Sequence, residues 1–193
     1  MEVLNALLEK NGGYVSTKEL QDAGITYREC QQLIEQGELE RQVQGLYLGS
    51  DYFPDPFFHL QYRCPQGVFS HETALYLHDL SDRDPLIYML TVPSGYGNRL
   101  MKEASYRFFY GNTELMQLGV MSLETPYGTQ VKAFDKERTL CDCLKYIDQL
   151  DRDLVLTALK RYLQLPEKDK SKLLHYAEKL NIRDRVYQYL EVL

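Results

Sequence analysis

The chain contains no tryptophan, few cysteines and no long apolar run. No hydrophobic stretch approaches the roughly 20 residues that a membrane-spanning helix requires. The N-terminal sequence MEVLNALLEKNGG is amphipathic and carries acidic residues, unlike a secretory signal. We therefore expect a cytoplasmic protein without a membrane partner.

The cysteines also argue against disulfides and metal centres. Cys30, Cys64, Cys141 and Cys143 form no Cys-x-x-Cys pair. Cys141 and Cys143 lie two positions apart in a predicted helix, so they face different sides of it. We interpret the thiols as reduced core residues.

His71-Glu72 begins like the zinc-binding pattern His-Glu-x-x-His, but position 75 holds Leu75. His78 follows His71 by seven residues, about 10 Å along a helix. Ligands of one zinc ion lie within a few ångströms of each other. The sequence therefore predicts neither a metal site nor a cofactor.

Basic residues are scarce: 22 Lys and Arg stand against 28 Asp and Glu, for a net charge of -6. Residues 1–50 contain four basic and eight acidic side chains. Non-specific DNA binding depends on neutralising phosphates. This balance excludes a general chromatin-type binder and remains compatible with a narrowly specific regulator.

The first 50 residues show the signals of a helix-turn-helix. Val3, Leu4, Leu7 and Leu8 predict an amphipathic helix that ends near Gly12-Gly13. Ser16 with Glu19, and Thr26 with Glu29, have the spacing of capping boxes and predict two further helix starts. Gly24-Ile25 is a short turn between these helices, as in a helix-turn-helix.

The third predicted helix carries the candidate base-reading residues. Cys30, Leu33 and Ile34 form one apolar face, which leaves Arg28, Gln31, Gln32 and Glu35 on the opposite side. Arg and Gln can form paired hydrogen bonds with guanine and adenine edges. A purely structural helical unit is the alternative.

Gly37 ends this helix, and residues 39–43 and 46–48 predict a hairpin around Gln44-Gly45. The sequence thus predicts a winged helix-turn-helix. The expected DNA-binding residues are Lys18, Thr26, Tyr27, Arg28, Gln31, Gln32, Arg41, Gln42 and Gln44. Arg41 alternates with Leu39 and Val43, so it has a second interpretation as a brace of the hairpin.

Two prolines, Pro54 and Pro56, indicate a linker at 51–56 between a domain at 1–50 and a second at 57–193. In the second, strands are expected at 87–93, 106–110, 120–125 and 129–134. Helices are expected from Ser70 to Asp79, after Asp135, and at 152–164, 167–180 and 182–192. The predicted fold is α+β: an N-terminal winged helix-turn-helix followed by a larger mixed α/β domain that ends in a helical bundle.

Catalytic motifs are weak. No Gly-x-Ser-x-Gly occurs, and no histidine lies in a known catalytic pattern. Ser94-Gly95-Tyr96-Gly97 follows a strand but lacks the third glycine of a dinucleotide site. Glu124 followed by Gln130-Val131-Lys132 is similar to a metal-dependent nuclease pattern, but a polar strand face also produces it.

Four stretches, together with Tyr27 and Leu33, resemble the AbiEi family of antitoxins from type IV abortive-infection toxin–antitoxin systems. The first is Gly37-x-Leu39-x-Arg41-x-x-x-Gly45-x-Tyr47. The others are Gly67-Val68-Phe69-Ser70-His71-Glu72-Thr73-Ala74-Leu75 with Thr91–Tyr96, and Asp135-Lys136-Glu137-Arg138-Thr139-Leu140-Cys141-Asp142.

The resemblance implies phage defence: a winged helix that binds operator repeats and represses its own operon, and a C-terminal domain that counters a nucleotidyltransferase-like toxin without a stable complex. It implies no enzyme. The alternatives are a winged-helix-guided nuclease-like enzyme and a solitary transcriptional regulator.

Overall fold

The computed structural model describes residues 2–192 and divides the chain into two compact units. Unit 1 runs to Arg63 and also includes Glu124–Gln130. Unit 2 comprises Cys64–Leu123 and the chain from Val131 onward. Residues 57–63 and 124–130, which the sequence analysis places in the C-terminal domain, therefore group with the N-terminal segment.

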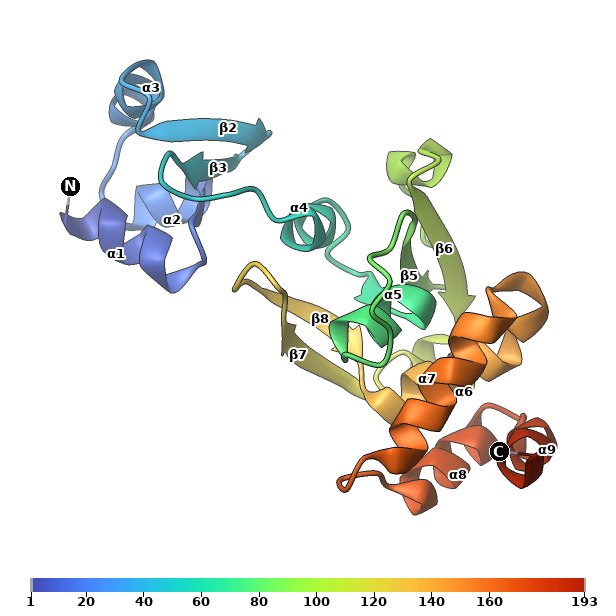
Figure 1. Ribbon diagram of the computed structural model, residues 1–193. Coiled ribbons are helices and arrows are strands. Elements are labelled where there is room, and N and C mark those ends of the chain that lie inside the picture. The colour runs from blue at the N-terminus through green and yellow to red at the C-terminus, as the bar shows by residue number, and fades with distance from the viewer. Residues whose placement is uncertain (1, 193) are drawn as a thin grey trace. The chain divides into compact units, whose positions relative to one another are not determined.

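Unit 1 has the element order of a winged helix-turn-helix (Figure 1). It contains α1 (Glu2–Lys10), β1 (Tyr14–Ser16), α2 (Thr17–Asp22), α3 (Tyr27–Glu35), β2 (Leu39–Val43), β3 (Leu46–Gly49) and α4 (Pro56–Arg63). The strands form an antiparallel sheet of order β1-β3-β2. The predicted α+β fold class is confirmed. β1 was not predicted, because three residues are too few to show alternation.

The core of unit 1 joins the helices to this sheet. Its buried members come from every element of the winged helix: Leu4, Leu8, Val15, Leu20, Cys30, Leu39 and Tyr47. Leu33 and Ile34 of α3 pack against this cluster. The apolar face predicted for the third helix thus lies on the core and leaves its other face to solvent.

The segment predicted as a linker contains the start of α4 instead. Pro56 is the first residue of this helix, where a missing N–H is not needed for helical hydrogen bonding. The buried Asp55 accepts hydrogen bonds from the Phe57 and Phe58 amides at 2.8 and 3.2 Å. Residues 51–55 form no helix or strand, so the structure differs from the expected linker only at Pro56, which already belongs to α4.

Unit 2 is built on a five-stranded mixed sheet of order β6-β5-β4-β8-β7 (Figure 1). Its strands are β4 (Val68–Phe69), β5 (Tyr88–Pro93), β6 (Tyr106–Gly111), β7 (Val120–Glu124) and β8 (Gln130–Phe134). β5 and β6 are parallel, as are β4 and β8, while β4 and β5 are antiparallel. β4 is only two residues long, so no alternation in the sequence indicates it.

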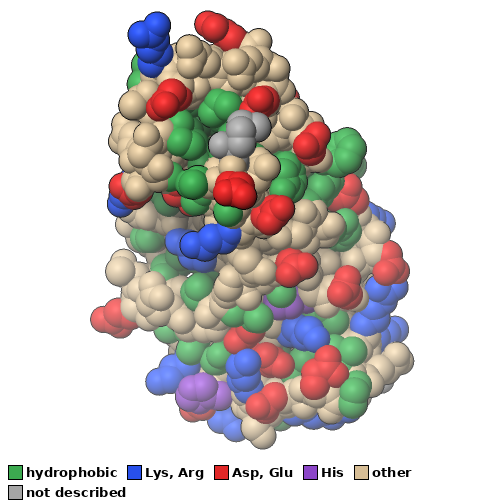
Figure 2. Space-filling model, turned by 90° about the vertical axis from the view of Figure 1, so that its left-hand side faces the viewer, with side chains coloured by type: hydrophobic (Ala, Val, Ile, Leu, Met, Phe, Trp, Pro, Cys, Tyr) green, Lys and Arg blue, Asp and Glu red, His purple; other side chains and the backbone are tan. Residues whose placement is uncertain are grey.

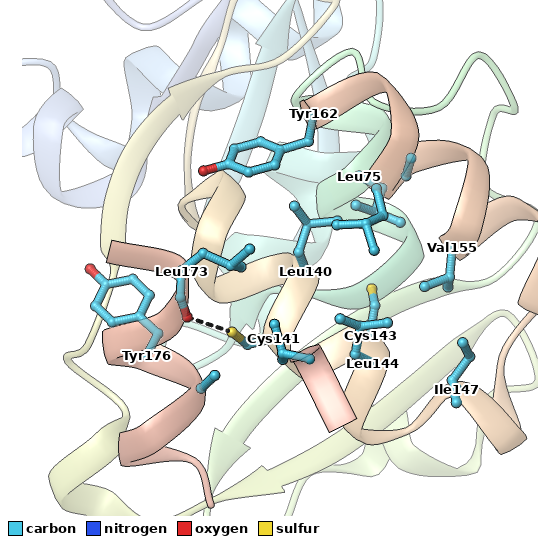
Figure 3. Packing of buried hydrophobic residues seen from close by; sticks show 14 of the residues in the cluster. Leu75, Leu140, Cys141, Cys143, Leu144, Ile147, Val155, Tyr162, Leu173 and Tyr176 are labelled. Carbon is cyan, nitrogen blue, oxygen red and sulfur yellow. Dashed lines mark hydrogen bonds between the residues drawn. The ribbon is translucent and has the colours of Figure 1, made fainter. Parts of the chain in front are cut away.

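The helices of unit 2 are α5 (His71–Leu77), α6 (Lys136–Lys145), α7 (Arg152–Gln164), α8 (Lys170–Lys179) and α9 (Arg183–Val192), with short 3₁₀ turns at Arg99–Lys102, Thr113–Leu115 and Ile147–Gln149. α6 is central: every residue from Glu137 to Leu144 is buried, and it contacts α5, α7, α8 and α9. Figure 3 shows α6 residues Leu140 and Leu144 in the core with Leu75 and Val155.

One predicted helix start differs from the structure, and a second lies where it was predicted but lacks the capping hydrogen bond. α8 begins at Lys170 because the Asp169 side chain accepts from the Lys172 amide and caps it there. Ser70 precedes α5, but its side chain makes no capping bond. The Ser70 hydroxyl is used instead by Thr91 and His71, at 2.9 and 2.8 Å.

All four cysteines are buried thiols outside any disulfide, as predicted. The Cys141 thiol donates to the Leu173 carbonyl at 3.5 Å (Figure 3). Burial raises the pKa of both Cys141 and Cys143 well above the ordinary range. Within residues 2–192, no helix is long and apolar enough to cross a membrane.

Candidate nucleic-acid interface

Two capping boxes define the helix-turn-helix. The Glu19 amide donates to the Ser16 hydroxyl at 3.2 Å, and the Ser16 amide donates to the Glu19 carboxylate at 2.8 Å. At α3 the Thr26 and Glu29 groups make the same pair of bonds, at 3.3 and 2.7 Å. The hydrogen bonds from Thr26 hold the pKa of Glu29 below its ordinary value. Both predicted helix starts are confirmed.

The turn between α2 and α3 depends on Gly24. Its φ of +81° lies in the left-handed region, which glycine adopts without steric cost. The Ile25 amide then donates to the Leu20 carbonyl at 2.8 Å and closes the end of α2. α3 begins at Tyr27, so only residues 23–26 connect the two helices.

α3 presents most of the predicted base-reading residues to solvent. Tyr27 is 70% exposed, and Thr26, Arg28 and Gln32 are also exposed. Gln31 is half-buried, so less of this side chain is available than the sequence analysis expects. The exposed positions gather in the N-terminal half of α3, the part of a recognition helix that contacts base edges.

The wing is the turn between β2 and β3. Gly45 has a φ of +81°, and its carbonyl accepts from the Thr17 amide at 2.9 Å and from the Tyr62 hydroxyl at 3.0 Å. α2 and α4 therefore both hold the wing in place. The sequence analysis missed Tyr62, because no local pattern connects it to a turn 17 residues earlier.

The predicted wing residues differ in exposure. Arg41 and Gln44 are exposed, whereas Gln42 is half-buried. Arg41 lies opposite the buried Tyr47 in the strand register, and an irregularity follows it before Val43. This interruption breaks the alternation from which the bracing interpretation of Arg41 was drawn.

Three cations belong to the predicted interface: Lys18 on α2, Arg28 on α3 and Arg41 on β2. All three are exposed, and none makes an ion pair within the part of the chain that the structure describes. On the face that Figure 2 shows, acidic and basic side chains are interspersed, and residues 1–50 contain only four basic side chains against eight acidic ones. Few cations are thus available to neutralise phosphates.

Comparison with known families covers this same segment. Residues 2–48 match the model of a family described as "Transcriptional regulator, AbiEi antitoxin". The AbiEi resemblance is confirmed over these residues. The matched segment contains the helix-turn-helix and both wing strands up to Leu48. The family is one of transcriptional regulators and antitoxins.

The fold of the chain as a whole is similar to that of a solved structure. The crystal structure of the RV2827C protein from Mycobacterium tuberculosis is similar to this chain, with a TM-score of 0.51 and 13% sequence identity. The similarity covers 98% of this chain and 79% of that one. At this identity the likeness concerns the fold alone. No curated protein matches the chain.

The residues of the nuclease-like pattern have other contacts. Lys132 donates to the Pro65 carbonyl at 2.5 Å, and the Gln130 amide donates to the Glu124 carboxylate at 3.4 Å. Among the described residues, no three His, Cys, Asp or Glu side chains are grouped so that they could hold a metal ion. The geometry therefore supplies no observation in favour of the nuclease hypothesis.

Proposed function

We propose that the protein is a DNA-binding autorepressor and antitoxin of a type IV toxin–antitoxin system. The winged helix of unit 1 binds operator repeats, and unit 2 counters a nucleotidyltransferase-like toxin. Neither action requires catalysis, a cofactor or a membrane. The toxin acts as a functional partner without a stable complex.

The observation that carries the proposal is the exposed N-terminal half of α3. Arg28 and Gln32 are solvent-exposed at the point where a recognition helix enters the major groove, and the helix is anchored from its other face by Cys30 and the core. The wing stands next in the chain with Arg41 and Gln44 exposed. Double-stranded DNA is the ligand whose edges and phosphates these groups match.

Specificity in this scheme comes from bases more than from phosphates. The four basic residues among residues 1–50 give few phosphate contacts against eight acidic side chains. Binding to unrelated DNA should therefore be weak, and operator binding should depend on Arg28, Gln31 and Gln32. The description of the matched family as antitoxins supports the proposed antitoxin role. We assign this role to unit 2, because we assign DNA recognition to unit 1.

Gel-shift titration of the full chain against its own promoter tests the DNA-binding role. Arg28→Ala should weaken operator binding by about 1–3 kcal/mol and relax the preference at one base pair. Lys160→Ala, which removes a positive charge from the exposed face of α7, is the matched control and should leave binding unchanged. Unchanged affinity for both Arg28→Ala and Gln32→Ala would contradict the proposed interface.

The same purified protein serves to test the enzymatic alternative. Incubation with supercoiled plasmid and Mg²⁺ or Mn²⁺ should give no nicked or linear DNA. Cleavage that disappears in Lys132→Ala would instead favour the nuclease hypothesis.

A further inference from the structure

Residues from two of the stretches that resemble the AbiEi family line one cavity of unit 2. The proposed DNA-binding role uses neither stretch. His71 is the first residue of α5, within the stretch Gly67–Leu75, and Arg138 and Asp142 lie on α6, within the stretch Asp135–Asp142. They line a small cavity of about 80 Å³ together with Thr91, Phe109 and Lys145. Its size suits a group of a few heavy atoms, since a cavity of about 150 Å³ holds benzene.

His71 is the most unusual residue of this cavity. It is 1% exposed, and its Nε2 atom has no hydrogen-bond partner within the described residues. The ring stacks on Phe109 with the centroids 3.6 Å apart and meets Tyr146 edge-on at 5.5 Å. Buried polar atoms without partners are rare in proteins, so this one requires a reason.

The hydrogen bonds on the Nδ1 side of the His71 ring determine whether Nε2 carries a proton. The Thr91 hydroxyl donates to the Ser70 hydroxyl at 2.9 Å, and Ser70 lies 2.8 Å from Nδ1 of His71. If each hydroxyl donates in turn, Nδ1 accepts and the proton of the neutral ring resides on Nε2. Burial, with the positive charges of Arg107, Arg138 and Lys145, lowers the pKa of His71 to about 3 and keeps the ring neutral. Nε2 is then an unused donor.

The remaining polar groups also favour an acceptor as the ligand. Arg138 is 2% exposed; its Nε donates to the Asp142 carboxylate at 3.0 Å, and its Nη1 donates to the Leu115 and Leu118 carbonyls at 2.6 and 2.9 Å. The Asp142 charge is therefore matched by Arg138. Lys145 is exposed and adds a second positive charge beside Arg138, against the single carboxylate of Asp142 in the lining of the cavity.

We propose that this cavity binds a phosphate group, either free inorganic phosphate or the terminal phosphate of a nucleotide. His71 Nε2 donates one hydrogen bond to a phosphate oxygen from inside the cavity, and Lys145 supplies the charge from its edge. The fixed orientation of the His71 ring between Phe109 and Tyr146 sets the position of that oxygen. The site belongs to unit 2 and does not depend on the proposed DNA binding.

Calorimetric titration of the full chain with inorganic phosphate, a nucleoside 5′-monophosphate and the matching nucleoside tests this proposal. Lys145→Gln should weaken binding by about tenfold or more, because hydrogen bonds between charged groups are the strong ones. His71→Phe should weaken it as well while it keeps the stacking on Phe109. Lys160→Gln makes the same charge change outside the cavity and should bind like the wild type.

The ligands of this titration distinguish the two possible sources of the phosphate group. Binding of inorganic phosphate supports the free ion, and binding of the monophosphate alone supports a nucleotide. In either case the imidazole N–H signal of His71 should shift in a proton–nitrogen correlation spectrum. The proposal is overturned if neither ligand binds at millimolar concentration, if the nucleoside binds as well as the monophosphate, or if Lys145→Gln and His71→Phe both bind like wild type.

Discussion

The carboxylate of Asp55 accepts a hydrogen bond from the Thr125 hydroxyl at 2.5 Å, although the two residues lie 70 positions apart in the chain. Thr129 donates to the same carboxylate oxygen, and the other oxygen caps α4. The Asp55 amide in turn donates to the Tyr14 hydroxyl at 2.6 Å. The buried Asp55 thus joins α4 and the tip of the β7–β8 hairpin through its carboxylate, and β1 through its backbone amide, all within unit 1.

Asp55→Ala should destabilise unit 1 by about 2–4 kcal/mol, because it uncaps α4 and leaves two buried hydroxyls without their acceptor. Chemical denaturation followed by tyrosine fluorescence measures the change. Asp51→Ala removes an exposed carboxylate nearby and is the control. A loss below about 0.5 kcal/mol in Asp55→Ala would show that the hydrogen bonds of the Asp55 carboxylate contribute little to the stability of unit 1.

Arg41 separates two interpretations of the wing. If it contacts a phosphate, Arg41→Gln should reduce the salt slope of operator binding by about one and leave the melting temperature unchanged. If it braces the hairpin, the melting temperature should fall while the slope stays. Lys10→Gln, on the exposed face of α1, removes the same charge outside the proposed interface. The exposure of Arg41 favours the phosphate contact.

Protection from the toxin should not require repression. With the cognate toxin expressed from an unrelated promoter, the full chain carrying Arg28→Ala and Gln32→Ala should still protect cells, because protection is assigned to unit 2. Cell growth after toxin induction measures it, and equal antitoxin levels are verified by immunoblot. Loss of protection in this double variant would place the antitoxin role in the α3 surface.

The buried His71 should make stability depend on pH. Its pKa of about 3 in the folded chain lies below the ordinary value of 6.5, so the unfolded chain takes up a proton that the folded chain excludes. The stabilisation is present above pH 6.5 and is lost as the pH falls toward 3, by at most about 1.4 kcal/mol per pH unit.

Asp142 changes the pH dependence of stability in the opposite direction from His71. Burial raises its pKa to about 6 from 3.8, so its contribution is present at low pH and is lost as the pH rises through about 6. Comparing wild type with His71→Phe cancels the Asp142 effect, since both proteins contain it. The difference in unfolding free energy should shrink as the pH falls below 6.5. The exposed His175→Phe is the control, and a difference independent of pH would contradict the buried neutral imidazole.

The local features of the winged helix were determined by the sequence alone. Each capping box joins residues three apart, the turn at Gly24 needs only its own φ, and the apolar spacing of α3 selects its buried face. Such interactions close within one helical turn, so neighbouring residue types are enough to predict them. The same holds for α7, whose predicted and observed bounds agree.

Contacts between distant segments were decided only by the tertiary structure. β4 has two residues and becomes a strand because Phe69 pairs with Ala133 on one side and Leu90 on the other. The sequence places Asp55 in a linker, whereas the fold brings the Thr125 and Thr129 hydroxyls within hydrogen-bonding distance of its carboxylate. His71 and Lys145 share a cavity because α6 packs against α5. These pairings depend on which surfaces the whole chain buries together, and no spacing along the sequence encodes that.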